Sequence, residues 1–245
     1  MIGLFFGKKK QTPPKSLKVD IHSHLIPAID DGSKSIDESL AIIEVMIDLG
    51  YQKIITTPHV MADTYRNSSQ DILDGAEILK KALIQNNLSV ELEVAAEYYM
   101  DDEFEHRLAS DDILTFGENY LLFETSYLYK PMRFYDVIYE IKAKGYNPIL
   151  AHPERYRYIT DPHKTFAELK ELGVYLQLDI NSLAGHYGKQ AKDHAMILSR
   201  CGMIDFLGSD IHHIKQVDFL KKVLSTSEYG DIFDHNTILN DMLSR

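Results

Sequence analysis

Two histidines separated by one residue, His22 and His24, stand at the end of a β-prone run that begins at Val19. Residues two apart on a strand point to the same side, so both imidazoles can reach one ion only near the end of the strand. Asp30 and Asp31 follow in a turn. The pattern is typical of a metal site, although His-x-His alone fits two polar residues in a loop equally well.

The same arrangement recurs along the chain. Short apolar segments, expected to be buried strands, alternate with amphipathic segments expected to be helices. After the first strand, we expect strands at 53–57, 90–96, 120–123, 148–151, 174–178 and 204–207, and helices at 35–49, 68–85, 134–144 and 162–172. Six of these seven strands end in a His, Asp or Glu. The alternation predicts parallel β/α packing in a barrel, whose active site gathers at the carboxyl ends of the strands.

The residues at these strand ends form a candidate ligand set without a thiolate: His22, His24, Asp31, His59, Glu97, Glu124, His152, Asp210 and His212. Imidazoles and carboxylates suit manganese, iron, zinc or cobalt better than a structural zinc site built from cysteines. Nine ligands are too many for one ion, which indicates two or three metals with a carboxylate such as Glu97 bridging them. Adjacent divalent ions hold a hydroxide at neutral pH and clamp a phosphoryl oxygen. The set therefore predicts hydrolysis of a phosphomonoester.

Several neighbouring residues have more than one interpretation. Arg155 could bind phosphate oxygens through its guanidinium, or it could form a surface ion pair. Either Asp30 or Asp31 could be the ligand, with the other orienting a histidine. His213 has the same ambiguity beside His212. Tyrosines that follow the third to fifth strands could pack individually or together rim the mouth of the site: Tyr98, Tyr99, Tyr127, Tyr129, Tyr156 and Tyr158.

The composition is that of a globular, acidic chain. At 245 residues and 44% hydrophobic composition, one barrel domain over residues 17–245 accounts for the length, and we expect residues 1–16 to form a flexible tail. The net charge of -11 argues against nucleic acid as a partner. No stretch approaches the about 18 apolar residues of a membrane span, so we expect no stable membrane insertion.

The single cysteine, Cys201, excludes an intramolecular disulfide and indicates a reducing compartment, which favours the cytoplasm. The segment from Cys201 ends in Leu207 where a cysteine phosphatase would need an arginine. We therefore expect no cysteine chemistry, and we expect Cys201 to be a small buried apolar residue.

Together these motifs resemble those of the PHP (polymerase and histidinol phosphatase) superfamily, and within it the manganese-dependent protein-tyrosine phosphatases of capsule and exopolysaccharide clusters. The resemblance covers most of the chain and is carried by the segments 20–24, 30–32, 57–59, 96–99, 122–124, 151–155 and 209–212. It implies a distorted seven-stranded (β/α)7 TIM-like barrel in which the nine candidates hold the metals, with manganese as the first choice. Arg155 would bind phosphate, and we assign catalytic roles to Arg155 and Asp210.

The resemblance also implies a phosphotyrosyl protein as substrate, such as the tail of a bacterial tyrosine kinase. In one place the chain departs from the family pattern. Family members often carry a further arginine shortly after the last histidine motif, where this chain has Lys215. Whether Lys215 replaces that arginine is left open.

Three other functions compete with this interpretation. A histidinol-phosphate phosphatase on the same fold would share every ligand and differ only in substrate recognition. An amidohydrolase also begins with His-x-His on a β/α barrel, but it usually carries a lysine on its fourth strand, where this chain has Glu124. A binding-only, kinase-docking module is the third alternative, and the intact set of candidate ligands argues against it.

Overall fold

The computed structural model describes residues 16–244, and its strands form two parallel sheets. The first sheet has the order β1–β2–β4, made by Val19–Asp20, Lys53–Thr56 and Glu91–Val94. The second has the order β3–β5–β6–β7–β8–β9, made by His59–Val60, Glu97–Tyr99, Tyr120–Glu124, Asn147–Ala151, Tyr175–Asp179 and Phe206–Gly208. Every pair of neighbouring strands within these sheets is parallel, as expected.

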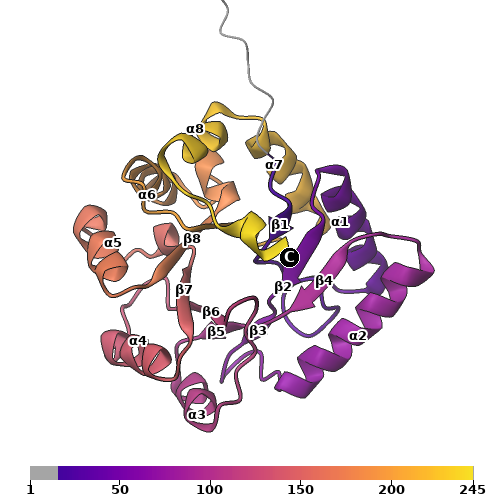
Figure 1. Cartoon of the computed structure of the whole chain (residues 1–245), viewed down its shortest axis with the longest axis horizontal. Helices are drawn as coiled ribbons and strands as arrows, with labels where there is room; N and C mark the ends of the chain where they lie inside the picture. The colour runs from indigo at the N-terminus through magenta and orange to yellow at the C-terminus, as the bar shows by residue number, and fades with distance from the viewer. Residues whose placement is uncertain (1–15, 245) are drawn as a thin grey trace, which may run out of the picture.

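Helices surround the strands on the outside (Figure 1). They are α1 (Ile36–Asp48), α2 (Ser69–Gln85), α3 (Asp102–Ser110), α4 (Phe134–Ala143), α5 (Pro162–Glu171), α6 (Lys189–Arg200), α7 (Ile214–Leu224) and α8 (Ser227–His235). Short 3-10 helices are η1 (Pro153–Arg155), η2 (Ile180–Ala184) and η3 (Asn240–Ser244). Side chains of Ser35, Ser68 and Asp161 accept hydrogen bonds from the first turns of α1, α2 and α5, which explains why these helices begin there.

Two of the expected strands are each broken into two pieces. The segment expected at 53–57 ends as β2 at Thr56, and β3 begins at His59, because Pro58 cannot donate a ladder hydrogen bond. The segment expected at 90–96 is divided between β4 and β5. The amide of Ala95 donates to the carbonyl oxygen of Thr56 (3.0 Å) and that of Glu97 donates to the carbonyl oxygen of Pro58 (3.0 Å), so the two chain segments stay hydrogen-bonded to each other through the breaks. The described strands are thus divided between two parallel sheets.

Buried apolar side chains cover both faces of the strands. One cluster lies inside, with Val19, Ile55, Leu122 and Phe206 among its members, and a larger one lies between the strands and the helices. Strands buried on both faces require nearly continuous apolar sequence, which is the pattern that the chain shows.

The 3-10 helix η3 closes the amino-terminal end of the strands. The side-chain amide of Asn240 donates to the carbonyl oxygens of Val19 (2.9 Å) and Leu207 (2.7 Å), and its oxygen accepts from the amide of Leu207 (2.9 Å). In Figure 1 the carboxyl-terminal segment accordingly lies over the middle of the molecule. The candidate ligands occupy the other end of the strands.

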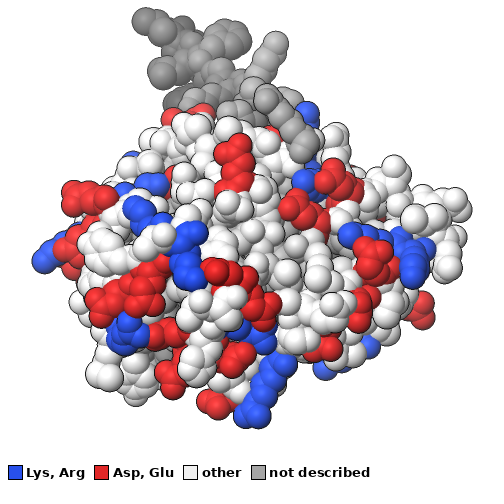
Figure 2. Space-filling view, turned by 60° about the horizontal axis from the view of Figure 1, so that its bottom comes forward, with Lys and Arg blue, Asp and Glu red and all other residues white. Residues whose placement is uncertain are grey.

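The surface carries no extended basic region on the face shown in Figure 2, where Lys and Arg are interspersed with Asp and Glu. This agrees with the net charge of -11. Within residues 16–244, the helices are too short or too polar to cross a membrane. Except for Ser16, the expected tail lies outside the described residues, and both domain boundaries remain predictions.

Candidate active site

Glu97, the first residue of β5, is the centre of the candidate site. Its Oε2 atom lies 3.2 Å from Nε2 of His22, 3.5 Å from Nε2 of His24 and 3.1 Å from Nδ1 of His59. Its Oε1 atom lies 3.0 Å from Nε2 of His152. One carboxylate thus contacts four of the five predicted histidines, which is the position that a bridging ligand needs.

Two further carboxylates, Asp210 and Glu124, lie on either side of this centre. The Oδ1 atom of Asp210 is 3.1 Å from Nε2 of His22 and 3.3 Å from Nε2 of His24. The Oε1 atom of Glu124 is 3.3 Å from Nδ1 of His59. The residues that end β6 or follow β1 and β9 therefore converge as expected, although Glu97 and His59 begin their strands rather than end them.

Asp30 and Asp31 are neighbours in the sequence, but their side chains have different positions in the site. Asp31 lies on the outer side, with Oδ1 3.5 Å from Nε2 of both His59 and His212. Asp30 is buried and turned away from this position, and its Oδ2 atom accepts from Nδ1 of His24 (2.8 Å) and from the amide of His59 (3.0 Å). Burial would raise the pKa of Asp30, but the His24 imidazolium and the hydrogen bonds lower it to about 2. Asp30 therefore orients a candidate ligand, while Asp31 faces two of them.

Gln177, in the middle of β8, also contacts the site and was missed by the sequence analysis. Its Oε1 atom lies 2.9 Å from Nδ1 of His22 and fixes which nitrogen of that ring faces Glu97. The approach requires Gly208, because a Cβ there would lie 2.5 Å from the Gln177 amide and 2.7 Å from Cβ of His22. The sequence signal that could have identified Gln177 is its position as a polar residue between the leucines of β8.

Arg155 projects from η1 toward the same end. Its Nη1 atom lies 2.5 Å from Oδ2 of Asp210, and Nη2 donates to the hydroxyl of Tyr127 (2.8 Å). The guanidinium lies 4.8 Å from the ring centre of Tyr127 and 4.0 Å from that of Tyr187. Asp179, at the end of β8, is 3.7 Å from Nη1. Arg155 is thus held at the edge of the ligand cluster and is no surface arginine, because its side chain is only 15% exposed.

The other residues singled out from the sequence take varied positions. Of the six tyrosines, Tyr127 reaches the site, whereas Tyr98 and Tyr156 are fully buried in the core and do not rim the mouth. His213 and Lys215 are exposed at the start of α7. The expectation that Cys201 is buried is wrong: it is exposed, because it caps the outer end of α6.

A family comparison agrees with this arrangement. The model of the family described as capsular polysaccharide synthesis, CpsB/CapC, matches residues 18–223. The chain belongs to the CpsB/CapC family. The family match confirms the predicted resemblance to the phosphatases of capsule clusters.

Several proteins with similar sequences are named as tyrosine-protein phosphatases. The tyrosine-protein phosphatase YwqE of Bacillus subtilis (strain 168) is 32% identical over 202 residues, which cover 82% of this chain and 80% of that protein. The putative tyrosine-protein phosphatase CapC of Staphylococcus aureus is 29% identical, with 84% and 81% covered.

A solved structure has a similar fold. It comes from work on YwqE of Bacillus subtilis and CpsB of Streptococcus pneumoniae, described as unique metal-dependent tyrosine phosphatases. It superposes with a TM-score of 0.78 at 31% identity, and the match covers 92% of this chain and 91% of that one.

Two candidate ligands of this CpsB/CapC chain have an unusual backbone. His152 and Asp210 have φ angles of 33° and 47°, in the left-handed region that residues other than glycine rarely adopt. His152 directly follows β7, and Asp210 is the second residue after β9; both strands end at this site. Such conformations persist where the surrounding structure holds a side chain in a required direction.

The buried charges at the site offset one another. Burial disfavours the charged form of Glu97, but His22 and His59 outweigh it and hold its pKa well below the usual value. Burial likewise opposes protonation of His22, yet Glu97 and Asp210 hold its pKa well above the usual value. The protons on these rings supply positive charge at the place where a divalent cation would supply it.

The donor atoms fit metal ions in number, type and direction. Among the described residues, buried atoms without a hydrogen-bond partner include Oε2 of Glu97, Oδ1 of Asp210 and Nδ1 of His59, all of which belong to candidate ligands. Three overlapping groups have ligand atoms within 4.8 Å of one another: His22, His24, Glu97 and Asp210; His59, Glu97 and Glu124; and His24, Asp31, His59 and His212. Nitrogen and carboxylate oxygen without sulfur is the donor set of catalytic manganese, iron and zinc centres.

Proposed function

We propose that this chain is a metal-dependent tyrosine-protein phosphatase. The observation that carries the proposal is the convergence of buried imidazole and carboxylate atoms on Glu97, with Arg155 beside them, in a member of the CpsB/CapC family. Metal ions at the buried cluster and the Arg155 guanidinium would together bind a phosphoryl group, because both neutralise the charge on its oxygens.

Two or three divalent ions would be held by the three groups described above, with His152 adding a nitrogen beside Glu97. Manganese is our first choice, with iron, zinc or cobalt as alternatives. Such ions lower the pKa of coordinated water and neutralise charge on a phosphoryl oxygen. The overlap at Glu97, His24 and His59 would hold the ions close together.

The protein's own residues position the reacting groups. Gln177 and Asp30 each hold the far nitrogen of one histidine ring, which directs Nε2 of His22 and His24 toward the centre. Arg155 would contact phosphate oxygens through its planar fork of donors, and the rings of Tyr127 and Tyr187 restrict its movement. Asp210 would take part both as a ligand and as the ion-pair partner that orients Arg155.

We further propose that the two sheets together form one distorted seven-stranded barrel in a single domain over residues 17–245. In support, β2 with β3 and β4 with β5 each occupy one strand position, joined by the hydrogen bonds across the breaks. A parallel bridge between Ser23 and Ile211 brings the chain after β1 beside the chain after β9. The PHP superfamily and a cytoplasmic location remain part of this proposal.

The substrate that we propose is phosphotyrosine on a protein segment, for example on a bacterial tyrosine kinase. The relatives named as tyrosine phosphatases support this choice over histidinol phosphate. Tyr127, which is 37% exposed beside Arg155, offers a ring on which a phenyl group can stack.

The test compares kcat/KM on a tyrosine-phosphorylated peptide and on histidinol phosphate at one manganese concentration and one pH. We expect the peptide to be preferred by about tenfold or more, which corresponds to about 1.4 kcal/mol of transition-state binding. Elemental analysis of active protein should give at least two metals per chain. His22→Ala and Glu97→Gln should lose both metal and turnover, while His106→Ala, at an exposed position in α3, should keep both.

Two results would contradict the proposal. A tenfold preference for histidinol phosphate would replace the substrate while leaving the metal site in place. Full turnover by protein that holds less than one metal per chain would remove the metal mechanism altogether.

A further inference from the structure

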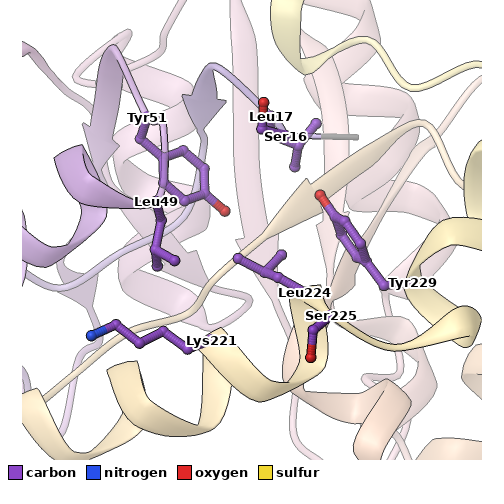
Figure 3. Close-up of a pocket in the computed structure, with 8 residues that line it drawn as sticks. All are labelled: Ser16, Leu17, Leu49, Tyr51, Lys221, Leu224, Ser225 and Tyr229. Carbon is purple, nitrogen blue, oxygen red and sulfur yellow. The ribbon is translucent and has the colours of Figure 1, made fainter. Parts of the chain in front are cut away.

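A cavity of about 180 Å³ lies far from the candidate ligands. Leu17, Leu49 and Leu224 supply apolar walls, and Tyr51 and Tyr229 complete them (Figure 3). Leu17 and Tyr51 precede β1 and β2, so the cavity lies at the amino-terminal ends of these strands. The candidate active site lies at their carboxyl-terminal ends, and the two sites are therefore separate.

The two tyrosines of the cavity, Tyr51 and Tyr229, are buried. Tyr51 is 3% exposed and Tyr229 is 0% exposed, and neither hydroxyl has a hydrogen-bond partner in the part of the chain that the structure describes. Figure 3 shows both hydroxyls pointing into the space between the rings. Buried hydroxyls are nearly always paired in folded proteins, so a pair of unpaired ones in an apolar cavity indicates a missing acceptor.

The charges around the cavity define what that acceptor can be. Burial raises the pKa of Tyr51 and of Tyr229, and Asp241 adds to the effect, so both hydroxyls stay protonated and act as donors. The same acidic neighbour disfavours an anion between the rings. Lys221 is the cation at the rim, and in Figure 3 its amine points away from both hydroxyls.

We propose that this cavity binds a small, mainly apolar, uncharged molecule whose carbonyl or alcohol oxygen accepts hydrogen bonds from Tyr51 and Tyr229. A carbonyl oxygen has two lone pairs and can accept from both hydroxyls at once. A water molecule needs about 10–15 Å³ of such volume, so the cavity has room for a ligand with a single ring. The proposal is independent of the proposed phosphatase function.

Acetophenone and α-methylstyrene are suitable probes, because they have nearly the same shape and differ in a carbonyl oxygen against a methylene group. Binding to the full chain can be measured by NMR titration. We expect acetophenone to bind about tenfold more tightly than the hydrocarbon, through two neutral hydrogen bonds. The Tyr51→Phe/Tyr229→Phe double variant should lose this preference, and Tyr139→Phe, at an exposed tyrosine of α4, should keep it.

Thermal unfolding of the ligand-free variants provides a second measurement. Removing an unpaired buried hydroxyl should leave Tm unchanged or raise it, and phosphatase turnover should not change. Three results would overturn the proposal: equal affinity for ketone and hydrocarbon, a clear fall in Tm in both single Phe variants, or ketone binding that appears only after residues 1–15 are removed. The last result would show that the chain itself fills the cavity.

Discussion

Replacing Arg155 by lysine tests the proposed phosphate contact directly. The guanidinium now spans Asp210 (2.5 Å) on one nitrogen and Tyr127 (2.8 Å) on another, and a lysine ammonium has one nitrogen for both directions. The substitution keeps the positive charge but gives up one charge-assisted hydrogen bond, which is worth about 1.5–3 kcal/mol. We therefore expect kcat/KM on a phosphotyrosyl peptide to fall by about 10- to 150-fold.

Arg155→Ala removes both contacts and leaves Asp210 without its ion-pair partner, so the loss should be larger, about 1,000-fold. The assay is steady-state hydrolysis at saturating manganese, with metal content measured on the same samples. Arg157→Lys is the matched control, because Arg157 is exposed and its contact with Tyr127 is made by its backbone amide. The reasoning fails if Arg155→Lys stays within about threefold of the parent, or if metal content falls in step with activity.

Three further predictions concern the surroundings of the ligands. Gln177→Leu removes the acceptor at Nδ1 of His22 and should weaken metal retention by about 10- to 100-fold in a chelator competition, whereas unchanged retention would show that His22 needs no support. Asp30→Ala should lower the free energy of unfolding of the metal-free protein in urea by about 1–3 kcal/mol, because it leaves three donors unpaired, Nδ1 of His24 and the backbone amides of Gly32 and His59. Asp31→Ala, at an exposed side chain, should change it by about 0.5 kcal/mol or less, and equal losses would contradict the roles assigned here. Cys201→Ser should keep full activity, since the thiol is exposed at the end of α6 and precedes β9, whose opposite, carboxyl-terminal end leads to the site; a selective loss of turnover would support cysteine chemistry.

The sequence predicted which side chains converge at the candidate site because strand ends and metal-ligand residue types coincide. His22, His152 and Asp210 each lie within two residues of the end of an apolar run, and a parallel β/α fold brings such ends together. Helix boundaries at Ser35, Ser68 and Asp161 followed from local capping, which depends only on neighbouring residues.

What could not be predicted depends on how side chains and elements are placed in three dimensions. The orientation of Asp30 toward His24 depends on a turn closed by Gly32, where a Cβ would lie 2.2 Å from the His24 carbonyl oxygen. The contact of Tyr187 with Arg155 joins η1 to the turn after η2, and the two segments share no sequence motif. Exposure of Cys201 depends on how α6 is placed against its neighbours, which composition does not determine.

The unequal burial of the ligands has a consequence for how the protein would acquire its ions. The side chains of His22 and Glu97 are 0% exposed, whereas that of Asp31 is 53% exposed. An ion held by the inner groups would be enclosed by buried side chains, so its exchange with the medium should be slow, whereas an ion held by the outer group, which includes Asp31, should exchange faster. The identity of the inner ions would then depend on which metals were present when the chain folded. The identity of the outer ion would depend on which metals are present during the assay. Two preparations with the same fold could therefore differ in turnover because different metals were present while each chain folded.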